Sequence, residues 1–100
     1  MINALRTAIA DADNLCTLAA LQPEDCSVTA ELVQRLVSDR SPLRHTGLDY
    51  RLDRALWRAD QAFQLWLPLI RDGRAKPMDW AGDLKSSLVS VKAEIQRLTS

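Results

Sequence analysis

The sequence predicts an all-α fold: a four-helix antiparallel bundle forming a single helical domain over residues 1–100. Two stripes of apolar residues carry this prediction, because each recurs at steps of three and four residues, the period of one helix face. With only 3 Gly and 4 Pro among 100 residues, the composition also favours helix over sheet. The first stripe is Leu52, Leu56, Ala59, Phe63, Trp66 and Ile70, and the second is Trp80, Leu84, Leu88, Val91, Ile95 and Leu98.

The first two helices are expected over residues 2–21 and from residue 24 or 28 to residue 38, with Pro23 ending the first. The inner side of the first helix is rich in Ala, so a neighbouring helix can approach it closely. Cys16 lies on that side, where a thiol acts as a small apolar filler. Cys26 lies near the start of the second helix. Two reduced cysteines are favoured, and a bridge between them is left open.

The third helix is expected from about residue 48 to residue 71, after a loop over residues 39–47. Asp49 suits the positive end of the helix dipole, and Gly73 suits the end of the helix. The ring of Pro68 clashes with the carbonyl of the preceding turn, so we expect the third helix to be kinked at Pro68.

The fourth helix is expected from Pro77, a favoured first helical position, almost to residue 100. It carries a strip of small residues beside its apolar stripe. We expect the first helix to pack against this strip, with contact to a second chain as the alternative. The strip consists of Gly82, Ser86, Ser90 and Ala93.

Two aromatic residues lie on the far side of the third helix from its stripe. Trp57 points about 140° away from the stripe centre, and Tyr50, seven residues earlier, points the same way. Because Trp and Tyr dominate interface energies, this pair is a candidate anchor for a partner. The alternative is that another helix covers the pair and makes it part of the core.

Charges on the third helix are segregated, with Arg51, Arg54 and Arg58 along one flank and Asp49, Asp53 and Asp60 along the other. Like charges four residues apart repel, and opposite charges on another chain would relieve that repulsion. A two-fold antiparallel homodimer would set each arginine flank against an aspartate flank. The alternative is a solvated surface whose ion pairs contribute little. Three residues of the preceding loop extend the basic region: Arg40, Arg44 and His45.

The sequence shows no catalytic constellation, phosphate-binding loop or metal-ligand spacing, so we expect no enzyme, no cofactor and no metal site. His45 lacks a second ligand or an orienting carboxylate nearby. The formal net charge is +0, so we expect no nucleic acid and no membrane as partner. The first residues lack the pattern of a secretory leader, which favours a location in the cytoplasm. We expect that cytoplasm to be bacterial.

We therefore expect a small non-enzymatic protein-interaction module, such as a regulatory, adaptor or inhibitor protein. It would bind another protein through the third helix and the preceding basic loop. One alternative is a homodimeric structural bundle without another partner. A second is a small-molecule-binding bundle whose pocket near Pro68 is lined by Phe63, Trp66 and Trp80. A third, a nucleic-acid binder, would lose affinity steeply with salt.

Overall fold

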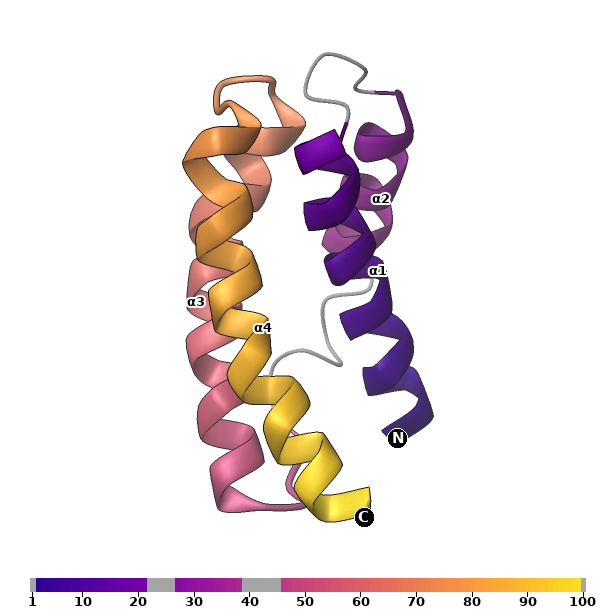
Figure 1. The fold of residues 1–100 in the computed structure, drawn as a ribbon, viewed down its shortest axis with the longest axis vertical. Coiled ribbons are helices and arrows are strands. Elements are labelled where there is room, and N and C mark those ends of the chain that lie inside the picture. Colours follow the sequence, from indigo (N-terminus) through magenta and orange to yellow (C-terminus); the bar gives the residue numbers. More distant parts are fainter. Residues whose placement is uncertain (1, 22–26, 39–45, 100) are drawn as a thin grey trace.

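In a computed structural model, the described residues, 2–21, 27–38 and 46–99, form four α-helices and no strand (Figure 1). The all-α prediction is confirmed, and the helix boundaries lie within one or two residues of those expected. The helices are α1 (Ile2–Leu21), α2 (Ser27–Ser38), α3 (Tyr50–Arg71) and α4 (Pro77–Thr99).

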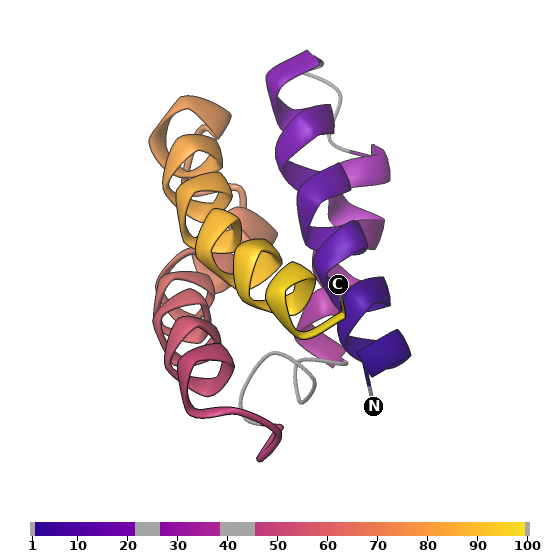
Figure 2. The same cartoon turned by 60° about the horizontal axis from the view of Figure 1, so that its bottom comes forward.

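Each helix packs against two others. Contacts join α3 to α4, α4 to α1, α1 to α2 and α2 to α3, and no contact between α1 and α3 or between α2 and α4 occurs within the described residues. In Figure 1, α4 lies between α3 and α1, and the N-terminal end of α1 lies near the C-terminal end of α4. Figure 2 shows the C-terminal half of α4 crossing between the same two helices. All four helices contribute to one apolar core.

The two predicted stripes form much of that core. Trp80 and Phe63 are its largest fully buried side chains, and burying such a side chain stabilises the fold by roughly 1.5–3 kcal/mol. Trp66 and Ile70 are only partly buried, and Leu98 is exposed at the end of α4. Leu67, which lies outside the predicted stripe, is fully buried. The buried face of α3 is therefore wider than a three-and-four spacing describes.

Two aspartates fix the start of α3. Asp49 is the N-cap, and its Oδ1 accepts a hydrogen bond from the backbone N–H of Leu52 at 3.1 Å. Asp53 accepts hydrogen bonds from the backbone N–H of Thr46 at 2.9 Å, from its hydroxyl at 2.8 Å, and from the N–H of Gly47 at 3.1 Å. Gly47 has φ of 72°, a backbone conformation that other residues rarely adopt. The first turn of α3 is thus held in one orientation.

Pro68 lies on the exposed side of α3, and the helix continues past it to Arg71. The backbone N–H of Asp72 donates to the carbonyl of Pro68 at 3.1 Å, and Gly73, with φ of 70°, ends the helix as expected. The kink expected at Pro68 stays a prediction.

The expected packing of α1 along the small-residue strip of α4 is wrong for most of the strip, because only Gly82 lines the grooves beside α1. The two helices do pack together, but all four strip residues are exposed: Gly82, Ser86, Ser90 and Ala93. At 100° per residue, the middle of the strip lies almost opposite the buried stripe of α4 rather than beside it. Instead, Lys92 of α4 forms an ion pair of 2.8 Å with Asp13 of α1, near the buried side chains of Ile9 and Ile95.

Cys16 is a buried free thiol among the core residues of α1, as expected of an apolar filler. Burial, together with the nearby carboxylate of Asp13, raises the pKa of the Cys16 thiol to about 11. Cys26 lies outside the described residues. Cys16 is therefore a structural residue rather than a reactive thiolate.

Candidate functional site

The outward face of α3 carries three large exposed apolar side chains. Tyr50 is 77% exposed, and Trp57 and Leu65 are each 61% exposed. At 100° per residue, the three side chains fall within an arc of about 80° on the side opposite the core. Trp57 is therefore a surface residue and not part of the core. We call these three residues the apolar face of α3.

Three exposed arginines lie toward the α4 side of this apolar face: at 100° per residue Arg54 falls between Trp57 and Leu65, and Arg58 and Arg51 lie just beyond Leu65. Arg51, Arg54 and Arg58 line a shallow groove of about 350 Å³ between α3 and α4, together with Ala55, Ser90 and Glu94. None of the three arginines forms an ion pair or a side-chain hydrogen bond with another described residue. Their spacing of three and four residues distributes the guanidinium groups over about 10 Å of the helix axis. The groove therefore presents a row of positive charges to a binding partner.

The carboxylate in this groove already has a partner. Glu94 accepts a hydrogen bond from Nε of Arg97 at 2.8 Å, and Nη2 of Arg97 lies 2.6 Å from Oδ1 of Asp49. The hydrogen bond to Glu94 is the main cause that raises the pKa of Arg97. The Leu52 N–H, and then Arg97, lower the pKa of Asp49. Glu94 thus already binds Arg97, a guanidinium that it shares with Asp49, and the three arginines outnumber the one carboxylate that lines the groove.

The aspartate flank does not form an open acidic surface. Asp49 caps α3 and binds Arg97, Asp53 holds residues 46 and 47, and Asp60 is only 6% exposed. The expected homodimer contact, in which the arginine flank of one chain faces the aspartate flank of another, therefore lacks its acidic half. Sequence spacing placed these aspartates on one side of the helix but could not show that the chain itself uses them.

Asp60 is the one buried charged residue in the described part of the chain. Its Oδ2 accepts a hydrogen bond from Nε2 of Gln64 at 2.7 Å, whereas its buried Oδ1 has no hydrogen-bond partner. No sequence pattern marked Asp60 as buried, because it was grouped with two aspartates that are partly exposed.

The remaining two predicted site residues, Arg44 and His45, lie outside the described residues, as does Arg40. The structure therefore brings together the part of the predicted site that lies on α3. That part consists of Tyr50, Trp57, Arg51, Arg54 and Arg58. Sequence reasoning missed Leu65, although the same helical arithmetic that placed Trp57 outside also places Leu65 there.

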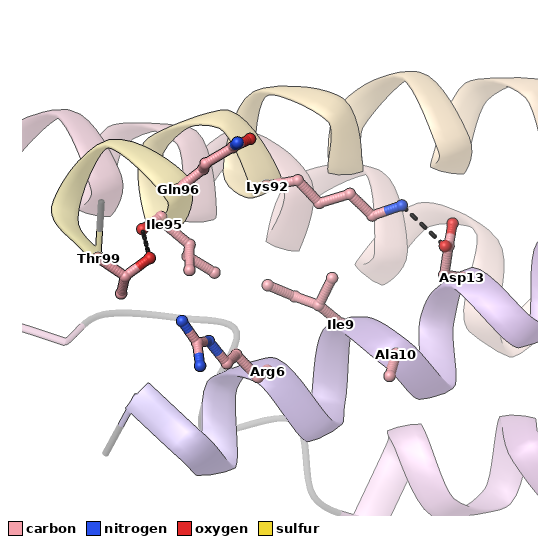
Figure 3. Close-up of a pocket in the computed structure, with 8 residues that line it drawn as sticks. All are labelled: Arg6, Ile9, Ala10, Asp13, Lys92, Ile95, Gln96 and Thr99. Carbon is pink, nitrogen blue, oxygen red and sulfur yellow. Dashed lines mark hydrogen bonds and ion pairs between the residues drawn. The ribbon is translucent and has the colours of Figure 1, made fainter.

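A second groove, of about 390 Å³, lies between α1 and α4 (Figure 3). Ile9 and Ile95 form its apolar floor, with the ion pair between Lys92 and Asp13 at one end and Arg6 toward the other. The charge of Lys92 is already matched by Asp13, so this groove offers less to a charged partner than the groove beside α3.

The pocket expected near Pro68 does not have its expected lining. Phe63 and Trp80 are buried in the core, and Nε1 of Trp66 donates a hydrogen bond to Oδ2 of Asp83 at 2.7 Å. Within residues 2–21, 27–38 and 46–99, no group of three or more His, Cys, Asp or Glu residues could hold a metal ion. In the same part of the chain, no helix has the length and apolar character to cross a membrane.

Comparisons with protein-family models, with curated proteins and with solved structures find no match to this chain. The function must therefore be argued from the surface itself. The apolar face of α3 together with its row of arginines differs from an ordinary solvated helix surface.

Proposed function

We propose that this chain is a small non-enzymatic protein-interaction module that binds a partner protein through the outward face of α3. The observation that supports the proposal is that Tyr50 and Trp57 lie exposed beside three arginines that lack a carboxylate partner among the described residues. Trp, Tyr and Arg are the side chains that contribute most to the binding energy of protein interfaces. The face belongs to a long, capped helix whose backbone is already ordered, so binding a partner costs little backbone conformational entropy.

Several further statements belong to the same proposal. The four helices form a single antiparallel bundle with a bend at Pro68, and the chain acts in the cytoplasm as a regulatory, adaptor or inhibitor protein. The packing of Ala19 and Ala20 beside Pro77 and Met78 supports the antiparallel arrangement, since it joins the end of α1 to the start of α4. The expected role of Arg44 and His45 in partner binding also remains part of the proposal.

Site-specific crosslinking in the native host tests the proposed surface. Gln61 is exposed and lies between Trp57 and Leu65 on the helix, so a photoreactive residue at position 61 would sample whatever covers the apolar face. We expect a crosslinked product that is lost when Trp57→Ala is introduced. Val89→Ala on α4 is the matched control, because Val89 is also exposed and apolar but lies on another helix. A product of equal yield in both variants would contradict the proposal.

A homodimer is the second candidate function, supported by a different surface. Among the residues whose exposure the structure describes, Leu21 and Met78 are the two most exposed aliphatic side chains, and both lie beside shallow grooves lined by the small residues Ala20, Ala81 and Gly82. A two-fold interface needs a protruding side chain and a hollow on the same patch. Light scattering over a dilution series tests this candidate, and Met78→Glu should abolish any dimer that uses the patch.

A further inference from the structure

We infer that the partner segment on the outward face of α3 is an acidic amphipathic helix, whose carboxylates bind Arg51, Arg54 and Arg58 and whose apolar side covers Tyr50, Trp57 and Leu65. This inference rests on the proposed function and adds the chemistry and shape of the partner.

The charge of the groove indicates the chemistry. Three guanidinium groups are exposed, without ion pairs to other described residues, and the nearby carboxylate of Glu94 is held by Arg97. Each guanidinium can bind one carboxylate through two parallel hydrogen bonds. Carboxylates on a partner would therefore satisfy all three arginines and remove their mutual repulsion along α3.

The spacing of the arginines indicates a helix. Along α3 the arginines follow one another at steps of three and then four residues. On an antiparallel partner helix, which runs in the opposite direction, carboxylates at positions i, i+4 and i+7 have the same spacing along the helix axis and face the three arginines in turn. An added β-strand would find no sheet edge, because the described residues contain no strand. The backbone of a helical partner satisfies its own hydrogen bonds, so side chains alone make the contact.

The apolar face sets the length of the partner segment. Tyr50 and Leu65 are fifteen residues apart, which corresponds to about 22 Å of helix and so to about four turns on the partner. The same face argues against a nucleic acid. A polyphosphate chain would leave the apolar side chains of Trp57 and Leu65 only partly covered.

A synthetic peptide tests the inference directly. The probe is a fluorescein-labelled amphipathic helix of about sixteen residues with Glu at positions i, i+4 and i+7 and Leu on the adjacent side, and binding is measured by fluorescence anisotropy at low salt. We expect replacement of the three Glu by Gln to weaken binding at least about tenfold. The triple variant Arg51→Gln, Arg54→Gln, Arg58→Gln should weaken binding of the Glu peptide to the same extent. Arg74→Gln is the matched control and should leave binding unchanged, because Arg74 is exposed in the connection between α3 and α4.

A charge-swap experiment separates specific pairing from general attraction. The triple variant Arg51→Glu, Arg54→Glu, Arg58→Glu should bind a peptide carrying Lys in place of Glu and should not bind the original peptide. Circular dichroism should show a helical spectrum and a cooperative melting transition for every variant, since these side chains form no ion pair with another described residue. Absence of binding to the Glu peptide, equal binding of the Gln peptide, or tighter arginine-dependent binding of a DNA duplex would overturn the inference.

The crosslinking experiment at position 61 distinguishes failure of the inference from failure of the proposed function. If the crosslinked product is lost with Trp57→Ala but retained with the arginine triple variant, the α3 face binds a protein and the acidic partner is wrong. If the product is retained with both changes, the surface itself is wrong. Loss of the product with both changes and retention with Arg74→Gln would support both statements.

Discussion

The buried carboxylate of Asp60 gives a stability prediction that can be worked out from the structure. Asp60 is 6% exposed, and its Oδ1 has no hydrogen-bond partner, so the folded state holds a buried polar oxygen that water would otherwise solvate. We expect Asp60→Ala to raise the stability of the protein, although it removes a hydrogen-bonded side chain. Most substitutions of buried residues lower the stability of a protein, so the predicted effect of Asp60→Ala has the opposite sign.

The expected gain follows from three contributions. Leaving a buried polar atom without a partner costs about 1–3 kcal/mol, and the substitution removes that cost. Alanine also favours the helix over aspartate by roughly 0.5–0.7 kcal/mol. Against this, the hydrogen bond from Gln64 is worth about 0.5–1.5 kcal/mol, and the exposed amide of Gln64 regains water when the bond is lost. The net gain in the free energy of unfolding is about 1–2 kcal/mol. Each kcal/mol raises the melting temperature of a domain of this size by roughly 4–8 °C.

Urea unfolding at neutral pH measures this gain, with Asp53→Ala as a matched control on the same helix. Asp53 accepts three hydrogen bonds from Thr46 and Gly47, so its removal should lower the free energy of unfolding by about 1–3 kcal/mol. The two aspartates therefore have predicted effects of opposite sign. A loss of stability in Asp60→Ala would refute the reasoning, because it would mean that the carboxylate is a net stabilising group.

Three further predictions follow from burial and from pKa values. Trp80 is 1% exposed, so Trp80→Ala should lower the free energy of unfolding by about 3–5 kcal/mol, whereas Trp57→Ala should lower it by less than about 0.5 kcal/mol, as measured by thermal unfolding. Equal losses would contradict the surface position of Trp57. In a Cys26→Ser variant at pH 8, Cys16 should react with a thiol reagent about a hundredfold more slowly than an exposed thiol, because its pKa is raised from 9.0 to about 11; reaction at the rate seen in denaturant would refute this. The pKa of Asp49 in the folded state is lowered below 3.8, so the stabilising effect of this carboxylate is present above that pH and is lost as the pH falls through the folded pKa. The stability difference between wild type and Asp49→Asn should therefore shrink in acid. A difference that grows in acid would contradict the assignment.

The positions of the four helices were largely predictable from sequence, because apolar spacing, Pro77 and Gly73 all act within a few residues of the chain. The start of α3 was also predictable, since Asp49 occupies a position where an acidic side chain stabilises a first turn. The buried side of each stripe followed from the same local periodicity. Only its width was underestimated, because Leu67 is covered by a neighbouring helix that the sequence of α3 does not describe.

Predictions of which helices pack together agree with the structure, whereas predictions of which face of a helix makes the contact were less successful. The strip containing Gly82 and Ser86 was assigned to a helix contact because small residues permit close approach, yet it lies exposed. The role of the aspartate flank was also set by distant residues, since Asp49 binds Arg97 from the other end of the sequence. Side-chain type predicts what a contact can be, whereas only the packing of all helices decides whether the contact is made.

The ion pair between Arg97 and Glu94 affects the charge that the groove between α3 and α4 presents. Arg97 lies one turn along α4 from Glu94 and forms a hydrogen bond of 2.8 Å to its carboxylate. Without that guanidinium, as in Arg97→Ala, the cations that line the groove with Glu94 would be Arg51, Arg54 and Arg58. The carboxylate would then be available to pair with one of these arginines, and the positive charge that the groove presents would fall. Arg97, which does not itself line the groove but hydrogen-bonds to Glu94 in its lining, thus keeps the surface cationic.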